Sequence, residues 1–181
     1  MERNLTLIAL FAALIAALGL IPAFTLAFGV PITAQSLGVM LCGTILGAKR
    51  GALAVLLFVL LVAMGLPLLA GGRGGLGVFA SPTVGFLIGF PIGAFVTGLM
   101  VEKLRIGSLG VTSALAAAVG GILVVYAFGV VGMAVALDKT IPEATLLIVS
   151  FIPGDLIKAI LAGVVTAALY KARPNSVLSR A

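Results

Sequence analysis

Two ionisable side chains interrupt an otherwise apolar stretch of the chain, "SFIPGDLIKAILAG" at residues 150–163. Asp155 and Lys158 are three positions apart, so a helix would place both on one face. Each costs roughly 2.5–3.5 kcal/mol at the centre of a membrane-spanning helix and therefore needs a partner or a polar cavity. Pro153 and Gly154, directly before the pair, predict a break in the helix. This combination is typical of a binding site inside a membrane, and a structural ion pair that closes on itself is the alternative.

A second candidate is the glycine-rich stretch "GGRGGLGVFASPT" at residues 71–83, which places Arg73 between two long apolar segments. Glycine lets a loop adopt positive φ and approach a ligand closely, so Gly72, Gly74 and Gly75 are candidate contacts. The letters "GRGGLG" fit the dinucleotide pattern G-x-G-x-x-G. That interpretation fails because no strand precedes the glycines and no βαβ unit surrounds them.

Other reactive chemistry is sparse. The chain has no histidine and one cysteine, Cys42, and Asp155 has no second carboxylate near it in sequence. These absences argue against the usual nucleophilic triads, zinc sites and paired-carboxylate hydrolases, so we expect neither an enzyme nor a metal site or cofactor. No G-x-x-x-x-G-K-[ST] motif occurs, and any ATP hydrolysis would have to come from partner subunits.

The elements that must position these residues are apolar helices. Hydrophobic residues make up 62% of the 181 positions and charged residues 9%, which is typical of an integral membrane protein. Because a spanning helix needs about 20 apolar residues, we predict an all-α, polytopic, single transmembrane domain covering residues 1–181. Its six predicted helices are residues 5–22, 35–48, 51–70, 82–101, 110–137 and 145–170. The second is short and follows the polar approach "VPITAQSL", which predicts a discontinuous or re-entrant segment containing Gln35.

The basic residues predict the orientation of these helices. Alternate connections place eight of them on one side: Arg3, Lys49, Arg50, Lys103, Arg105, Lys171, Arg173 and Arg180. The other side receives Arg73 and Lys139. This is a positive-inside pattern rather than a nucleic-acid footprint, so both termini are predicted to be cytoplasmic and the glycine-rich loop to face outward.

Helix length gives an independent depth for Asp155. It lies 16 residues before Lys171, or ~24 Å into a hydrocarbon core about 30 Å thick. Both arguments bring Arg73, Asp155 and Lys158 towards one outward-facing pocket. Their summed charge of +1 suits a small monoanion whose uncharged part donates hydrogen bonds to Asp155.

Small residues recur every four positions in several predicted helices. Ala9, Ala13 and Ala17 form such a row on the first helix. The row is a candidate for docking a partner protein because the helix is terminal, and packing against another helix of this chain is the alternative. The glycine rows are expected to pack the helices of this chain against one another; they are Gly43, Gly47 and Gly51, and Gly85, Gly89 and Gly93.

Residues 31–98, from "PITAQSLG" to "GAFVTG", together with "PGDLIKAILA" at 153–162, closely resemble the BioY family. These are the biotin-specific substrate-binding (S) components of energy-coupling-factor (ECF) transporters. The resemblance implies an S-component fold in a cell membrane, outward-facing capture of biotin, and docking onto a transmembrane coupling protein with two ATPase subunits. It also implies that the row of Ala9, Ala13 and Ala17 serves this docking.

The resemblance suggests roles for the candidate residues. Asp155 would accept hydrogen bonds from the ureido ring of biotin, and either Lys158 or Arg73 would lie near the carboxylate. Gln35 and the glycines 72, 74 and 75 are further candidate contacts. The chain departs from the family pattern where Ser81, Val84 and Phe86 stand in place of Gly, Gly and Tyr.

Three other functions stay open. An S component for another vitamin would keep the fold and change the ligand. A stand-alone ion-coupled carrier of small anions would need no ATPase. A scaffold without transport activity would bind no small molecule, and its Asp155 and Lys158 would be replaceable together by apolar residues.

Overall fold

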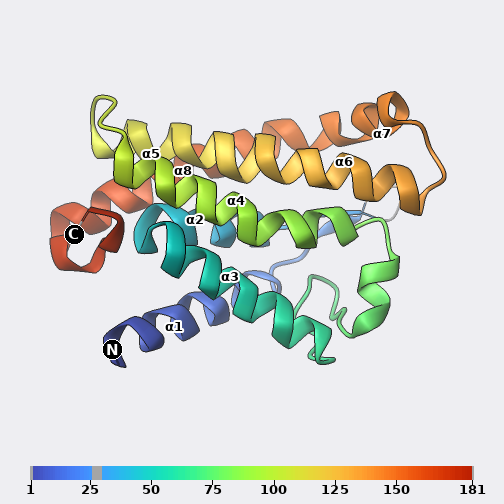
Figure 1. The fold of residues 1–181 in the computed structure, drawn as a ribbon, viewed down its shortest axis with the longest axis horizontal. Helices are drawn as coiled ribbons and strands as arrows, with labels where there is room; N and C mark the ends of the chain where they lie inside the picture. The colour runs from blue at the N-terminus through green and yellow to red at the C-terminus, as the bar shows by residue number, and fades with distance from the viewer. Residues whose placement is uncertain (1, 26–29, 181) are drawn as a thin grey trace.

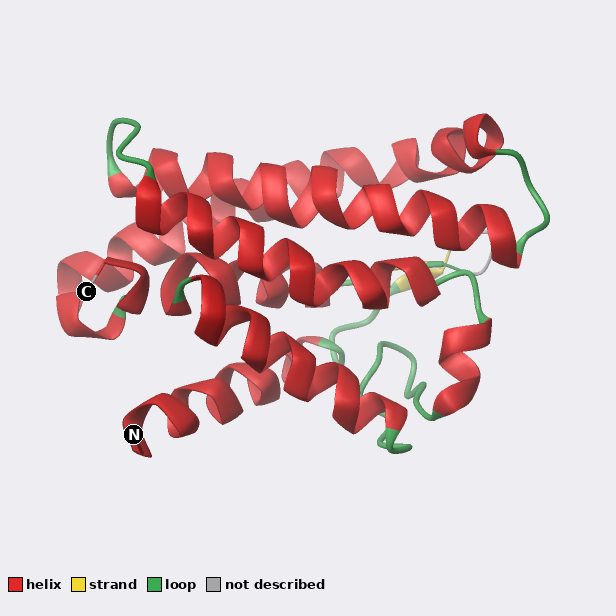
Figure 2. Cartoon of the chain, viewed as in Figure 1, coloured by secondary structure: helices red, strands yellow, loops and turns green. Residues whose placement is uncertain are grey.

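The computed structural model describes residues 2–25 and 30–180, and these residues are mostly helical (Figure 2). The helices lie roughly along the long axis of the molecule (Figure 1). In chain order they are α1 (Glu2–Leu18), α2 (Gln35–Leu46), α3 (Ala48–Ala63), α4 (Val84–Lys103), α5 (Leu109–Ala118), α6 (Val125–Ala136), α7 (Ile141–Ile148) and α8 (Ile152–Ala172). The strands β1 (Phe24–Thr25) and β2 (Pro31–Ile32) pair as a short antiparallel ladder between α1 and α2.

Two pairs of these helices are continuous. A π-helical segment, η2 (Val119–Val124), joins α5 to α6, and a 3-10 turn, η3 (Val149–Phe151), joins α7 to α8. The described residues therefore form six helical units, and the predicted all-α fold is confirmed. Three units are long and apolar enough to cross a membrane: Val84–Lys103, Leu109–Ala136 and Ile141–Ala172. In contrast, α2 has 12 residues and a length of about 18 Å, which is too short to cross a hydrocarbon core of ~30 Å.

Several predicted helix ends need correction. The first helix ends at Leu18 rather than residue 22, next to Gly19 and Pro22. The third ends at Ala63 rather than residue 70, because the chain turns at Gly65 with a φ of 107° that few other residues adopt. The last unit begins at Ile141 rather than residue 145, where Thr140 and Glu143 form a reciprocal capping box.

Pro153 and Gly154 do not interrupt the last helix as predicted. The hydrogen-bonding pattern changes one turn earlier, in η3, and α8 begins at Ile152. Pro153 thus occupies the first turn of α8, where its missing N–H removes no helical hydrogen bond. Asp155 also lies in this first turn, so the polar pair sits where the helix resumes.

Glycines bring the helix backbones close together. A Cβ at Gly85 of α4 would lie 2.1 Å from the carbonyl oxygen of Phe128 on α6, and a Cβ at Gly43 of α2 would lie 2.6 Å from that of Ala94 on α4. No Cβ fits at such distances without movement of the backbone. The glycine rows therefore pack helices within this chain.

The outward face of α1 is different. Ala12 and Ile15 are buried against the bundle, whereas Ala9, Ala13 and Ala17 are exposed and form a smooth stripe along the helix. The two labelled chain ends lie at one end of the long axis (Figure 1), and the loop after α3 lies at the other end.

Candidate ligand-binding site

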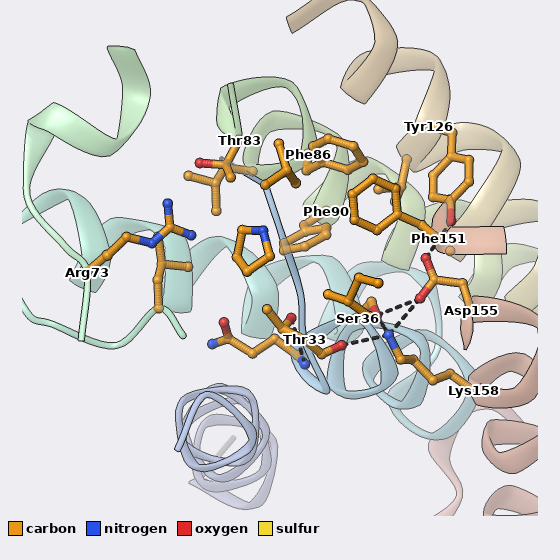
Figure 3. Close-up of a pocket in the computed structure, with 18 residues that line it drawn as sticks. Thr33, Ser36, Arg73, Thr83, Phe86, Phe90, Tyr126, Phe151, Asp155 and Lys158 are labelled. Carbon is orange, nitrogen blue, oxygen red and sulfur yellow. Dashed lines mark hydrogen bonds and ion pairs between the residues drawn. The ribbon is translucent and has the colours of Figure 1, made fainter. Parts of the chain in front are cut away.

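A cavity with an empty volume of about 620 Å³, including solvent at its mouth, lies inside the bundle. We call it the main cavity. Its walls come from β2, the start of α2, the loop after α3, α4, η2, α6 and the turn that begins α8. Segments far apart in the sequence therefore meet around one space (Figure 3).

Asp155 and Lys158 lie at one end of the main cavity and form an ion pair of 2.7 Å. Lys158 also reaches two groups on the segment that leads into α2. Its Nζ donates to the carbonyl oxygen of Thr33 at 2.6 Å and to Ser36 Oγ at 2.9 Å. A lysine ammonium has three N–H donors, so these three acceptors use all of them.

Asp155 is 7% exposed and is held by three donors. Its Oδ1 accepts from Lys158 at 2.7 Å and from Ser36 Oγ at 3.1 Å. Its Oδ2 accepts from the Tyr126 hydroxyl at 2.7 Å. Each carboxylate oxygen has about two acceptor positions, so Oδ2 keeps one for a ligand. We call Ser36, Tyr126, Asp155 and Lys158 the polar cluster (Figure 3).

Aromatic side chains cover the middle of the main cavity. Phe86 packs edge-on against Tyr126, with ring centroids 6.2 Å apart, and against Phe151 at 6.0 Å. Phe90, one turn further along α4, also lines the cavity. Phe86, Phe90 and Phe151 form an aromatic wall that can hold the apolar body of a ligand between polar ends.

Arg73 lies across the main cavity from the polar cluster (Figure 3). Its backbone exchanges two hydrogen bonds with Leu69, at 3.0 and 3.2 Å, and its Nε donates to the Ala70 carbonyl oxygen at 3.3 Å. Partial burial lowers the pKa of its guanidinium, but an arginine keeps its charge at neutral pH. Among residues 2–25 and 30–180, Asp155 and Lys158 form the one ion pair, so the Arg73 charge has no acidic partner there.

Gln35 lines the same cavity, and both N–H donors of its amide are used. Its Nε2 donates to the carbonyl oxygens of Ile15 and Leu68, at 3.1 and 3.0 Å, and its Oε1 accepts from the Ala70 N–H at 3.1 Å. The side chain is 2% exposed. In this geometry Gln35 braces α1 against the loop that carries Arg73. Its Oε1 keeps one acceptor position, and its ligand contact stays a prediction.

The predicted glycine contacts are divided. Gly72 lines a second, more open hollow beside the main cavity, and the two spaces share Pro31 and Arg73. Gly74 and Gly75 line neither space. Gly74 packs so closely on Leu66 that a Cβ would lie 2.1 Å from its carbonyl oxygen. The geometry gives these two glycines a part in shaping the loop, and their predicted ligand contact stays a prediction.

Several cavity residues were not predicted from the sequence, and Tyr126 is the most informative of them. It is one of two tyrosines in the chain and lies inside an apolar helix, and that isolation was the available signal. Nothing in the sequence pairs it with Asp155, 29 positions away. Ser36 was hidden in the polar approach to α2, and phenylalanines in an apolar helix do not stand out.

Two of the three departures from the family pattern, Phe86 and Ser81, have local explanations. The ring of Phe86 forms part of the aromatic wall and packs against Tyr126. The Tyr126 hydroxyl bonds Asp155, so the site has a tyrosine hydroxyl although position 86 lacks one. Ser81 Oγ bonds the Val78 carbonyl oxygen at 2.7 Å and the Thr83 hydroxyl at 2.6 Å, and so closes the turn before α4.

Apolar helices arranged around one pocket with polar ends define a helical membrane protein with a small-molecule site. The chain belongs to the BioY family, whose family model matches residues 2–175. It is 53% identical to "Biotin transporter BioY" of Rhodobacter capsulatus, over 99% of this chain and 100% of that protein. It is also 53% identical to the protein of the same name from Rhizobium etli, over 95% of both chains.

A solved structure agrees with this assignment. The crystal structure of "the S-component for biotin from an ECF-type ABC transporter" matches with a TM-score of 0.88 at 32% sequence identity. The match covers 94% of this chain and 92% of that chain. These relatives are transport proteins, and this chain is accordingly a membrane transport protein rather than an enzyme.

Proposed function

We propose that this chain captures biotin and takes part in its uptake as the S component of an ECF-type transporter. One observation carries the proposal: a pocket with a hydrogen-bonded carboxylate at one end and an unpaired arginine at the other. Biotin has two ends that complement those of the pocket. Its ureido ring offers two N–H donors, and its side chain ends in a carboxylate. The similarity to two biotin transporters at 53% identity supports the same ligand.

The ureido ring fits the polar cluster. Asp155 Oδ2 keeps an acceptor position beside the Tyr126 hydroxyl, and a ureido N–H can donate to it. A hydrogen bond to a charged group contributes roughly 1.5–3 kcal/mol. Because Asp155 is already charge-paired with Lys158, it can accept this bond without becoming an isolated buried charge.

The carboxylate fits Arg73 better than Lys158. All three Lys158 donors are used by Thr33, Ser36 and Asp155. The Arg73 guanidinium has five donors, of which its Nε uses one on the loop itself. The N–H groups on its two Nη atoms point in parallel and match the two oxygens of a carboxylate. The apolar rings and chain of biotin would then lie along the aromatic wall.

Uptake requires partners and a defined orientation. In our proposal both termini are cytoplasmic, the main cavity opens outward, and the exposed stripe of Ala9, Ala13 and Ala17 contacts a transmembrane coupling protein. Two ATPase subunits bound to that protein supply the energy for release, and the chain itself carries no cofactor. The small side chains of the stripe support close helix contact in lipid.

The test is titration calorimetry of the purified protein with biotin, riboflavin and thiamine. We expect biotin alone of the three to bind. Asp155→Asn should weaken biotin binding by about tenfold or more, because the amide cannot replace the charged acceptor. Lys139→Gln changes a cation outside the main cavity and serves as a control that should bind as the wild type does.

The outcomes separate the alternatives. Tighter binding of riboflavin or thiamine would contradict the assignment of biotin as the ligand and leave the S-component fold unaffected. Near-wild-type affinity of Asp155→Asn would remove the proposed role of the carboxylate. Uptake by liposomes that hold this chain alone, driven by a proton gradient, would replace the ATPase-dependent mechanism by that of an ion-coupled carrier.

A further inference from the structure

A separate hollow lined by two arginines lies far from the main cavity, at the end of the bundle where both termini lie (Figure 1). Its empty volume is about 340 Å³, including open solvent. It is lined by residues of the α4–α5 loop, the start of α5, the end of α8 and the C-terminal turn: Arg105, Gly107, Leu109, Tyr170 and Arg180. We call it the arginine cavity.

Arg180 is fixed in the wall of this cavity, and no acidic side chain of residues 2–25 and 30–180 forms an ion pair with it. Its Nη2 donates to the Leu104 carbonyl oxygen at 3.0 Å. Its Nε and Nη1 are buried and have no hydrogen-bond partner in the part of the chain that the structure describes. A partly buried guanidinium in this state is costly unless an anion lies nearby.

The other walls also favour negative charge. Arg105 is exposed at the cavity, so its guanidinium is free to turn towards a ligand. Leu109 is the first residue of α5, and the N-terminus of a helix carries a partial positive charge. Ser108 caps this helix through the Val111 N–H at 3.3 Å, and the N–H groups of Leu109 and Gly110 have no acceptor among the described residues.

Tyr170 supplies the remaining polar contact. It is 40% exposed on the last turns of α8, and its ring lines the arginine cavity. Tyrosine is enriched at the level of lipid headgroups, where its ring meets acyl chains and its hydroxyl meets polar groups. Two arginines, a helix N-terminus and a tyrosine therefore surround a space at the end of a membrane-embedded bundle.

We infer that the arginine cavity binds a phosphate group, and that the phosphate of an anionic phospholipid is its natural occupant. Arg105 and Arg180 contribute the charge, and the start of α5 contributes N–H donors, as at other phosphate sites on helix N-termini. The inference is independent of what the main cavity binds. Free phosphate shares the same chemistry, so the test must separate the two sources.

The experiment is native mass spectrometry of the full chain in detergent with equal amounts of dioleoylphosphatidylglycerol and dioleoylphosphatidylcholine. We expect the wild type to retain the anionic lipid preferentially. The double variant Arg105→Gln/Arg180→Gln should retain it about thirtyfold less, because each of the two basic residues near an anionic headgroup contributes on the order of 1 kcal/mol. Lys49→Gln/Lys171→Gln removes the same charge from exposed positions outside the cavity and should retain the lipid as the wild type does.

Arg105→Gln alone guards against misfolding, since the Arg105 side chain is exposed and holds no other element in place. Its retention of the anionic lipid should also fall. Equal retention of both lipids by the wild type, or equal loss in the arginine and lysine double variants, would overturn the site. Thermal unfolding in sodium phosphate and in sodium chloride of equal ionic strength identifies the source. If phosphate raises the unfolding temperature of the wild type and not of the arginine double variant, soluble phosphate can also occupy the site. If phosphate raises neither, the site is restricted to lipid.

Discussion

At the scale of single residues, the arrangement of donors decides which cation meets a ligand. Lys158 has three acceptors for its three N–H groups, so its charge stabilises Asp155 and ties α8 to the segment before α2. Arg73, across the main cavity, uses one side-chain donor, its Nε, within the part of the chain that the structure describes. Lys158 and Arg73 carry the same charge, but they differ in the number of N–H donors that a ligand can use.

Arg73→Gln should remove the discrimination between biotin and its methyl ester. In the wild type we expect the ester to bind about tenfold more weakly, because it lacks the charge that pairs with the guanidinium. In the variant, biotin and the ester should bind equally. Calorimetry with both ligands measures the effect, and Lys139→Gln is the control. Discrimination that survives in Arg73→Gln and disappears in Lys158→Gln would contradict this orientation.

Tyr126→Phe should weaken biotin binding by about tenfold, because it removes the hydroxyl that holds Asp155 Oδ2. The ring stays in place against Phe86, so the thermal stability should change little. Thr145→Val is a matched control, since its hydroxyl donates to the Ile141 carbonyl oxygen of its own helix and lies outside the main cavity. Unchanged affinity in Tyr126→Phe would show that Asp155 is positioned by Lys158 and Ser36 alone.

At the scale of elements, the bundle divides its small residues between two tasks. Glycines on α2 and α4 face neighbouring helices, where a side chain would collide with backbone carbonyls. Alanines 9, 13 and 17 face away from the bundle. The same four-residue spacing thus serves internal packing in one helix and leaves a free surface in another, and burial alone distinguishes them.

Ala13→Leu should leave biotin binding unchanged and reduce ATP-driven uptake when the chain is reconstituted with a coupling protein and ATPases. The reason is steric, since a larger side chain separates two helices that approach through small residues. Ala136→Leu, at an exposed alanine of α6, is the matched control and should transport normally. Uptake that stays at the wild-type level in Ala13→Leu would place the docking surface elsewhere.

At the scale of the whole molecule, the two cavities lie at opposite ends of the bundle. The main cavity adjoins the glycine-rich loop, and the arginine cavity adjoins the C-terminal turn (Figure 1). The eight basic residues counted on one side of the predicted membrane include both arginines of the arginine cavity. The proposed ligand and the proposed lipid therefore meet opposite faces of the membrane.

This arrangement predicts the labelling of introduced cysteines in intact cells. A membrane-impermeant maleimide should react with Gly77→Cys, at an exposed position of the 3-10 helix Leu76–Ala80 before α4, and not with Ala172→Cys, at the end of α8. The native Cys42 is fully buried and should stay unlabelled in both variants. Labelling of Ala172→Cys instead would invert the proposed orientation.

The helical class, the number of helical units and the central polar pair were predictable because they depend on local properties. Apolar length predicts a membrane helix, and the high cost of charge in lipid marks Asp155 and Lys158 as special wherever they lie in the fold. The ends of the third and sixth helices were less accessible, since Gly65 and the Thr140 capping box act through backbone conformation.

Sequence by itself thus determined a helical membrane protein with two ionisable residues on one helix face and a cation in a glycine-rich loop. Tertiary structure alone decided that Tyr126 and Ser36 complete the polar cluster, that Gln35 is a brace, and that Lys158 has no donor left for a ligand. The physical reason is that hydrogen bonds are directional and few. Which donors stay free depends on partners that are often more than a hundred positions away, and no local pattern records them.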